Sequence, residues 1–144
     1  MSVCYWGIVG FGLKVQMEMF DWKKCLPLIK QRFKVNPKDI ESITSQEEFF
    51  NFLDDADICF DGLLNEFVNK EKHINYIGGA DSDKGDYILF FPGYPWEFDK
   101  EDMELTENAV REKIYNCLKP YLIDSISKED ILSQIDHIST YGCG

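Results

Sequence analysis

The sequence predicts an α+β fold, with a small antiparallel or mixed sheet of three to four strands and helices packed mainly on one face. Two apolar segments, residues 74–80 and 87–91, flank the turn-forming sequence Asp-Ser-Asp-Lys-Gly and are typical of a hairpin. Helical patterns with N-capping residues occupy much of the middle and the end of the chain. Strands and helices do not alternate regularly, which disfavours a doubly wound sheet. Residues 1–144 are expected to form one domain, since no repeat or linker-like segment divides them.

The first strand is expected over residues 3–15, where β-forming residues are mixed with three glycines. Glycine inside a strand marks a bend or the close approach of another backbone. Asp21 is expected to cap the first helix, and Pro27 to kink that helix or to begin a second piece. Asn36, followed by a proline at the first helical position, predicts a short second helix.

Capping patterns also mark the next helices. Ser45 and Glu48 have the spacing of a capping box and precede a helix rich in phenylalanine. Asp54 or Asp57 is expected to cap the following helix, whose apolar pairs recur at near-helical spacing.

Two helices and two strands are expected in the second half of the chain. Asp99 is expected to cap the longest helix, with Met103 in its buried stripe. Ser127 should cap a last helix that turns its residues Leu132 and Ile135 inward. The short apolar run 87–91 predicts a central strand buried on both faces, and residues 138–143 predict a short edge strand.

The composition is that of a soluble globular protein, with 44% apolar residues. No apolar run approaches the length that spans a membrane, and the first residues lack the pattern of a signal peptide. The five cysteines are odd in number, scattered and never spaced as CxxC, which favours reduced thiols. We therefore expect a cytoplasmic protein without a membrane partner.

The net charge of −11 is distributed unevenly. Residues 1–38 carry seven basic and two acidic residues, whereas residues 45–104 carry 16 acidic and four basic residues. Such a field repels nucleic acid, and two arginines in the whole chain offer little for reading bases. The expected partner is therefore a basic protein surface, of the kind found on nucleases or toxins, and not nucleic acid itself.

No motif predicts catalysis, a cofactor or a metal site. The glycines at 7, 10 and 12 have the order GxxGxG, whereas a dinucleotide-binding loop has GxGxxG. The acidic segment 81–86 departs from a calcium-binding loop, since a lysine replaces one ligand and a proline replaces the bidentate acid. His73 and His137 lack metal-site spacing and have no neighbouring cysteine or serine nucleophile in the sequence. A Cys–His pair brought together by folding stays an open alternative.

Two acidic groups and an aromatic loop are the candidate partner-binding residues. One or two carboxylates suffice to cap a helix, so the remaining ones favour either solubility or a basic partner. The prolines flanking the aromatic loop stiffen it, and aromatic side chains rimmed by charge are typical of interfaces. The alternative for Trp96 is that it covers the core. The candidates are Asp54, Asp55, Asp57, Asp61, Tyr94, Trp96, Glu97, Asp99, Glu101, Asp102 and Glu104.

The leading functional hypothesis is a non-enzymatic inhibitor or binding protein whose carboxylates replace the phosphates of nucleic acid on a basic surface. The expected class of protein is a phage or bacterial anti-defence or immunity protein. The alternative is a small-molecule binding protein or minor enzyme, with a pocket between the glycine-rich first strand and the aromatic loop 94–98. A third hypothesis is a homodimer in which the basic residues 23–38 meet the acidic half of a second copy.

Overall fold

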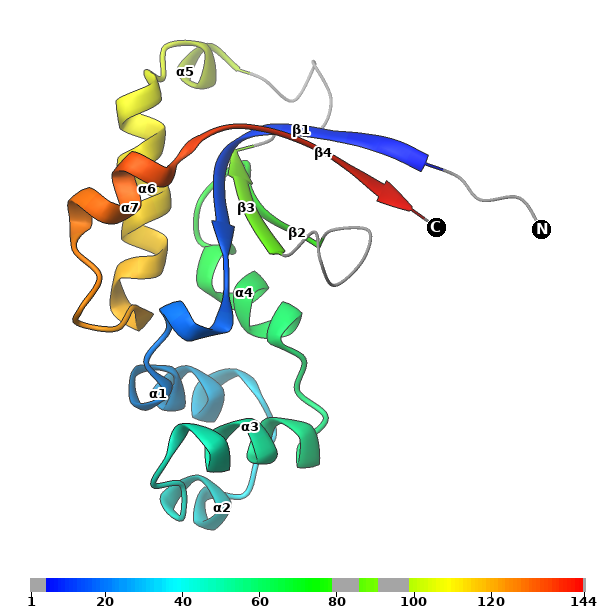
Figure 1. Cartoon of the computed structure of the whole chain (residues 1–144), viewed down its shortest axis with the longest axis vertical. Coiled ribbons are helices and arrows are strands. Elements are labelled where there is room, and N and C mark those ends of the chain that lie inside the picture. Colours follow the sequence, from blue (N-terminus) through cyan, green and yellow to red (C-terminus); the bar gives the residue numbers. More distant parts are fainter. Residues whose placement is uncertain (1–4, 79–85, 91–98, 144) are drawn as a thin grey trace.

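The computed structural model describes residues 5–78, 86–90 and 99–143, with the backbone alone for residues 5–9 and 140–143. Its sheet has the strand order β2-β3-β1-β4, and every neighbouring pair is antiparallel. The strands are β1 (Tyr5–Val15), β2 (Ile74–Gly78), β3 (Asp86–Phe90) and β4 (Asp136–Cys143). The predicted α+β fold with a small sheet is thereby confirmed (Figure 1).

β3 is the central strand that the apolar run predicted, and it is buried on both faces. Ile88 belongs to the main core, whereas its neighbours Tyr87 and Leu89 pack with Ile77 and Ile138 on the opposite face. Ile88 and Leu89 are both 0% exposed. The predicted hairpin pairing of β2 with β3 is confirmed, while its turn lies outside the described residues.

Seven α-helices are present in the described residues. Their bounds are α1 (Trp22–Arg32), α2 (Pro37–Glu41), α3 (Gln46–Asp55), α4 (Phe60–Val68), α5 (Lys100–Met103), α6 (Glu107–Leu118) and α7 (Lys128–Gln134). In the same part of the chain, the 3-10 turn η1 (Met17–Met19) connects β1 to α1, and η3 (Lys119–Tyr121) lies between α6 and α7. α4 packs beside β2 and α6 beside β3, while α1, α2 and α3 lie together at one end of the molecule (Figure 1).

Most of the predicted helix starts are confirmed by side-chain hydrogen bonds. Asp21, Asn36 and Ser127 each accept a backbone N–H from the first turn of the helix that they begin. Ser45 likewise accepts the N–H of Glu48, but the Glu48 carboxylate turns back to the N–H and hydroxyl of Thr44, so the predicted capping box is incomplete.

Several details of the predicted helices were wrong. Neither Asp54 nor Asp57 caps α4: its N-cap is Cys59, which makes no capping bond through its side chain. Asp99 caps only the short helix α5, and Thr106 caps the longest helix, α6.

Two predictions of buried stripes also need correction. Met103 is 73% exposed because it ends α5 and does not take part in the apolar stripe of α6. Ile131 is the fully buried residue of α7, and Leu132 only packs against the core from a half-buried position. Ile135 is buried as predicted. α1 runs through Pro27 as one helix, so no second piece begins there.

Candidate acidic binding surface

The first acidic group lies where α3 ends and α4 begins. Asp54 and Asp55 close α3, Asp57 lies in the connection, and Asp61 lies in the first turn of α4. All four residues are exposed. We call them the α3–α4 acidic surface.

Helix capping does not account for three of these four carboxylates. Asp54 and Asp55 lie at the C-terminal end of α3, where the helix dipole is negative and a further negative charge is unfavourable. Asp57 has a φ of 57°, a left-handed conformation in which aspartate is more common than most other residues, and it does not cap α4. Asp61 is different, since it lies at the positive end of α4. Asp54 and Asp55 therefore destabilise the helix that they end.

The chain segment that holds this surface is strongly acidic. The segment 39–61 holds eight acidic residues and no basic residue. In the part of the chain that the structure describes, no basic side chain forms an ion pair with any of the eight. Two basic residues of helix α1 pair with other acids: Lys24 with Asp124 at 2.6 Å, and Arg32 with Glu66 at 3.4 Å.

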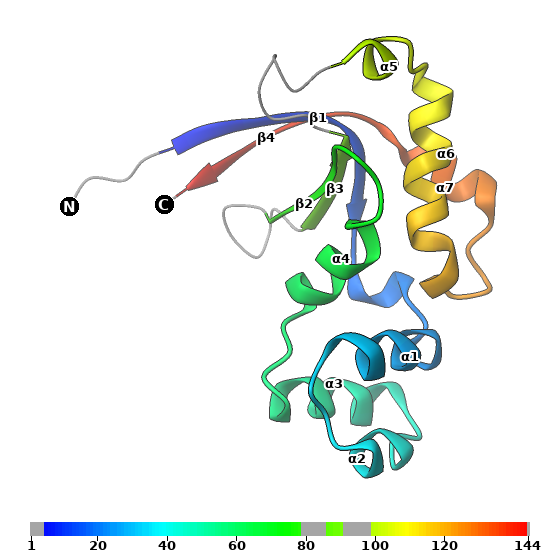
Figure 2. The same ribbon diagram turned by 180° about the vertical axis from the view of Figure 1, so that it is seen from behind.

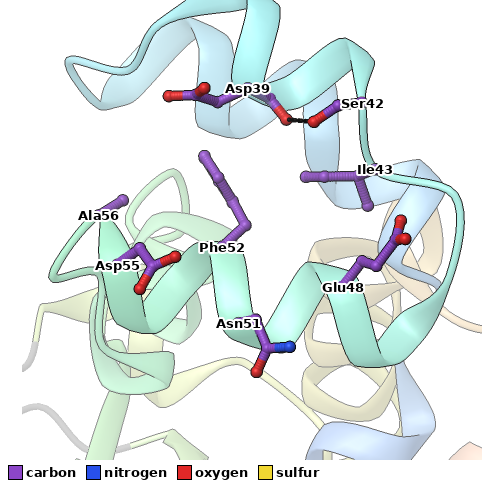
Figure 3. A pocket seen from close by; sticks show the side chains of 8 residues that line it. All are labelled: Asp39, Ser42, Ile43, Glu48, Asn51, Phe52, Asp55 and Ala56. Carbon is purple, nitrogen blue, oxygen red and sulfur yellow. Dashed lines mark hydrogen bonds between the residues drawn. The ribbon is translucent and has the colours of Figure 1, made fainter.

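A groove of about 510 Å³ runs between α2 and α3 beside this surface. Figure 3 shows Phe52 and Ile43 pointing into it, with carboxylates around them. The carboxylates belong to Asp39, Glu48 and Asp55, so Asp55 is shared by the groove and the α3–α4 acidic surface. Two hydrogen bonds from Thr44 lower the pKa of the Glu48 carboxyl, which keeps it charged. The groove thus combines an apolar centre with an anionic rim.

A second hollow, of about 390 Å³, lies on another side of the end of α3. Asp54 and Asp57 line it together with apolar side chains that include Leu53 and Phe60. The end of α3 is therefore flanked by two hollows of the same character, each with carboxylates over apolar side chains.

Most carboxylates of the second acidic group, around α5, bind other groups of the same chain. Asp102 is only 6% exposed and accepts the backbone N–H of Asp99 at 3.1 Å, while Asp99 accepts the N–H of Asp102 at 2.9 Å. His73 Nε2 lies 3.0 Å from Asp102 Oδ2, and the Lys72 ammonium pairs with both carboxylates. Glu104 is 4.0 Å from the Lys100 ammonium. Glu101 is exposed.

The pKa values around Lys72 follow from these contacts. The Lys72 ammonium, helped by the N–H of Asp102, lowers the pKa of the Asp99 carboxyl from 3.8 to about 2. In turn, the hydrogen bond to Asp99 raises the pKa of Lys72. This pair stays ionised near neutral pH and fixes the start of α5 to the segment before β2.

The structure does not bring the two acidic groups together. α5 and α3 lie at opposite ends of the longest axis in both views (Figures 1 and 2). Tyr94, Trp96 and Glu97 lie outside the described residues, as does the loop side of the predicted small-molecule pocket. Those parts of the prediction stay predictions.

Of the three described thiols, Cys25 and Cys117 are buried and Cys59 is exposed. Burial raises the pKa of the Cys25 thiol to about 12 and that of Cys117 to about 11, which disfavours the reactive thiolate. His137 pairs with Glu107 at 3.3 Å. Among the described residues, no group of three or more His, Cys, Asp or Glu could hold a metal ion, and no helix is long and apolar enough to cross a membrane.

Sequence reasoning missed the groove residues Asp39, Glu48, Ile43 and Phe52. The absence of basic residues from segment 39–61 indicated that this part of the chain is unusual, but it does not tell which helices pack against each other.

Comparison with family models, with curated proteins and with solved structures finds no match to this chain.

Proposed function

We propose that this protein binds a basic surface of another protein through the α3–α4 acidic surface and the adjoining α2–α3 groove. The observation that carries the proposal is the position of Asp54, Asp55 and Asp57. All three are exposed and have no ion-pair partner among the described residues, and Asp54 and Asp55 stand where the helix dipole disfavours them. Charges that weaken the fold and are left uncompensated are expected at a binding site, where a partner supplies the opposite charge.

The groove adds a requirement on the shape of the partner. An apolar side chain can enter between Ile43 and Phe52, while flanking lysines or arginines reach Asp39, Glu48 and Asp55. Basic surfaces that bind nucleic acid offer such cations at close spacing. On these surfaces the carboxylates would take the place of phosphates, and binding would block the nucleic acid.

The test begins with two cationic peptides of equal charge, one of lysines with glycines and one of lysines with leucines. Both are expected to bind more weakly as ionic strength rises, because the attraction between exposed charges is screened. The leucine peptide should bind more tightly, because the groove accepts an apolar side chain. Removing two carboxylates with Asp54→Asn and Asp55→Asn should weaken binding roughly tenfold. Fluorescence anisotropy at low and high salt measures each affinity.

The matched control removes two carboxylates elsewhere with Glu129→Gln and Asp136→Asn, so that the net charge changes equally. Both residues are exposed and lie on α7 and at the start of β4. The control variant should bind as the natural chain does. Equal weakening by both variants would overturn the proposed surface, and affinity that does not depend on salt would overturn the proposed function.

A second arm addresses the partner class with a panel of basic nucleases. Binding in the same salt-sensitive manner, together with loss of nuclease activity, is the expected result. The α3 variant should lose inhibition in parallel with affinity, and the control variant should keep it. If no basic nuclease of the panel binds, the proposal that the carboxylates replace the phosphates of nucleic acid is wrong.

A further inference from the structure

β1 and β4 extend beyond the rest of the sheet as a two-stranded ribbon. β1 pairs with β3 only from Phe11 to Val15, whereas it pairs with β4 from Tyr5 to Gly12. Figure 1 and Figure 2 show the two strands projecting away from the helices. A ribbon of two strands has marginal stability in water when nothing else supports it.

β4 is an outer strand, and the helices cover only its beginning. There Arg111 Nε donates to the carbonyl oxygen of Ile135 at 3.3 Å, and His137 reaches Glu107. Among the described elements, β1 is the one with which β4 makes extensive contact. The outer edge of β4 after His137 therefore has no neighbouring strand in the described part of the chain.

The ribbon lacks the usual features that prevent one strand edge from pairing with another. Natural edge strands carry lysines, prolines or other charges, or they are short. β4 spans eight residues, and after His137 it has neither a charge nor a proline. Residues 1–13 are also uncharged, although 28% of the whole chain is charged. Such an edge is suited to pairing and has no charge with which to attract the basic partner proposed above.

We propose that β4 pairs antiparallel with β4 of a second copy of this chain, so that two sheets join into one across a two-fold axis. With the axis at Ser139, the two serines face each other on one face of the joined sheet, and Ile138 faces position 140 of the other copy. Asp136 faces position 142 of the other copy, so the two aspartates stay apart. Each copy contributes the same strand to the interface, as a two-fold axis requires.

Charge complementarity also favours a second copy as the occupant. The edge is neutral, and the α3–α4 acidic surface lies away from it, at the far end of the long axis (Figure 1). Two copies can therefore join at β4 while their most acidic segments stay distant. This inference does not depend on the proposed function; if both hold, the dimer presents two acidic surfaces and gains avidity for a partner with repeated basic sites.

The test is the molar mass of the full chain by light scattering and sedimentation, at protein concentrations up to about 500 µM. We expect a dimer of two 16.8 kDa chains that is not weakened by added NaCl. Ser139→Lys puts a like charge beside the axis in both copies and should raise the dimer dissociation constant at least about tenfold. Ser133→Lys, an exposed substitution on α7, is the matched control and should leave the constant unchanged.

A mixture of Ser139→Lys and Ser139→Glu chains should recover a mixed dimer, because opposite charges then meet at the axis. Circular dichroism and urea unfolding of each variant show whether it folds, and the recovery in the mixture supports the interface even if one variant alone is less stable. A natural chain that stays monomeric over the whole range would overturn the proposal. A dimer that Ser139→Lys leaves intact would place the contact on another surface, and a dimer that NaCl dissociates would place it on a charged surface. Either result would overturn the proposal.

Discussion

The identity of Gly12 is determined by how closely β1 and β3 approach. A Cβ atom added to Gly12 would lie 2.0 Å from the carbonyl oxygen of Ile88 and 2.8 Å from the Cα atom of Leu89. These are backbone atoms, so the clash cannot be relieved by rotating a side chain. The sequence predicted a bend or a close approach in this strand, and Gly12 fulfils the second expectation.

We expect Gly12→Ala to lower the free energy of unfolding by about 2 kcal/mol or more, since the two strands must separate to admit the methyl group. Gly62→Ala is the matched control, because a Cβ atom there meets only the Phe33 ring at 3.9 Å. Gly62 lies in α4, where alanine is the better helix former, so this variant should gain roughly 0.5–1 kcal/mol. Urea unfolding measures both. A Gly12→Ala chain as stable as the natural one would contradict the strand pairing described here.

Asp99 provides a pH-dependent contribution to stability. Its pKa is lowered to about 2 in the fold, chiefly by Lys72, so the carboxylate stabilises the fold fully above its ordinary pKa of 3.8. This contribution is lost as the pH falls from about 4 through about 2, because protonation removes the charge that Lys72 binds. Asp99→Asn keeps a capping oxygen and removes only the charge.

We therefore expect Asp99→Asn to unfold at a lower urea concentration than the natural chain at pH 7, and the difference to be mostly lost by pH 2. Urea midpoints at several pH values measure the difference. A gap between the two chains that stays constant from pH 7 to pH 2 would mean that Asp99 acts through its shape and not through its ion pair.

At the scale of secondary-structure elements, α3 carries acidic residues at its C-terminal end, where the helix dipole is already negative. Ser45 caps its N-terminus well, but the last turn carries Asp54 and Asp55, and no basic residue lies in that turn. Sequence reasoning assigned Asp54 or Asp57 as the cap of the next helix. It was misled because an aspartate before an apolar run also looks like an N-cap, and only the left-handed φ of Asp57 and the N-cap Cys59 show where α4 begins.

The double variant Asp54→Asn and Asp55→Asn is expected to be more stable than the natural chain, by roughly 0.3–1 kcal/mol per residue, since it removes charges that oppose the helix dipole. Thermal and urea unfolding at low ionic strength measure the gain. The combination of higher stability with weaker binding is what distinguishes a binding residue from a structural one. A double variant that is less stable than the natural chain would show that these acids have a structural role.

The remaining helices illustrate what capping patterns can and cannot predict. Asp21, Asn36, Ser45 and Ser127 were correctly assigned, because a short polar side chain before an apolar run has one common structural use. The break between α5 and α6 was missed. Thr106 lies only three residues after Met103, the last residue of α5, and caps a new helix; two capping signals so close together are hard to separate by pattern alone.

At the scale of the whole molecule, the fold class followed from the sequence, but the arrangement of charge did not. The central strand, the hairpin pairing and the edge strand were predictable from apolar periodicity. Periodicity does not tell how far apart two segments lie after folding. Sequence reasoning assigned both acidic groups the same candidate role in partner binding, whereas they stand at opposite ends in the structure (Figure 2).

The net charge of −11 should make the stability of the natural chain depend on salt. Self-repulsion of the uncompensated acids in segment 39–61 lowers stability, and NaCl screens it, so the midpoint of thermal unfolding should rise with NaCl. The rise should be smaller in the Asp54→Asn, Asp55→Asn variant than in the Glu129→Gln, Asp136→Asn control, because only the first variant relieves a crowded segment. Differential scanning calorimetry at two salt concentrations measures this; an equal rise in the two variants would argue against local repulsion.

An NMR titration of the ¹⁵N-labelled chain with the lysine–leucine peptide locates the binding surface residue by residue. We predict that the backbone amide shifts concentrate in segment 39–61, with the largest changes around Phe52 and Asp55, and that they diminish as NaCl is added. Shifts concentrated on α5 to α7, or distributed evenly over every acidic residue of the chain, would contradict the assignment of binding to the end of α3.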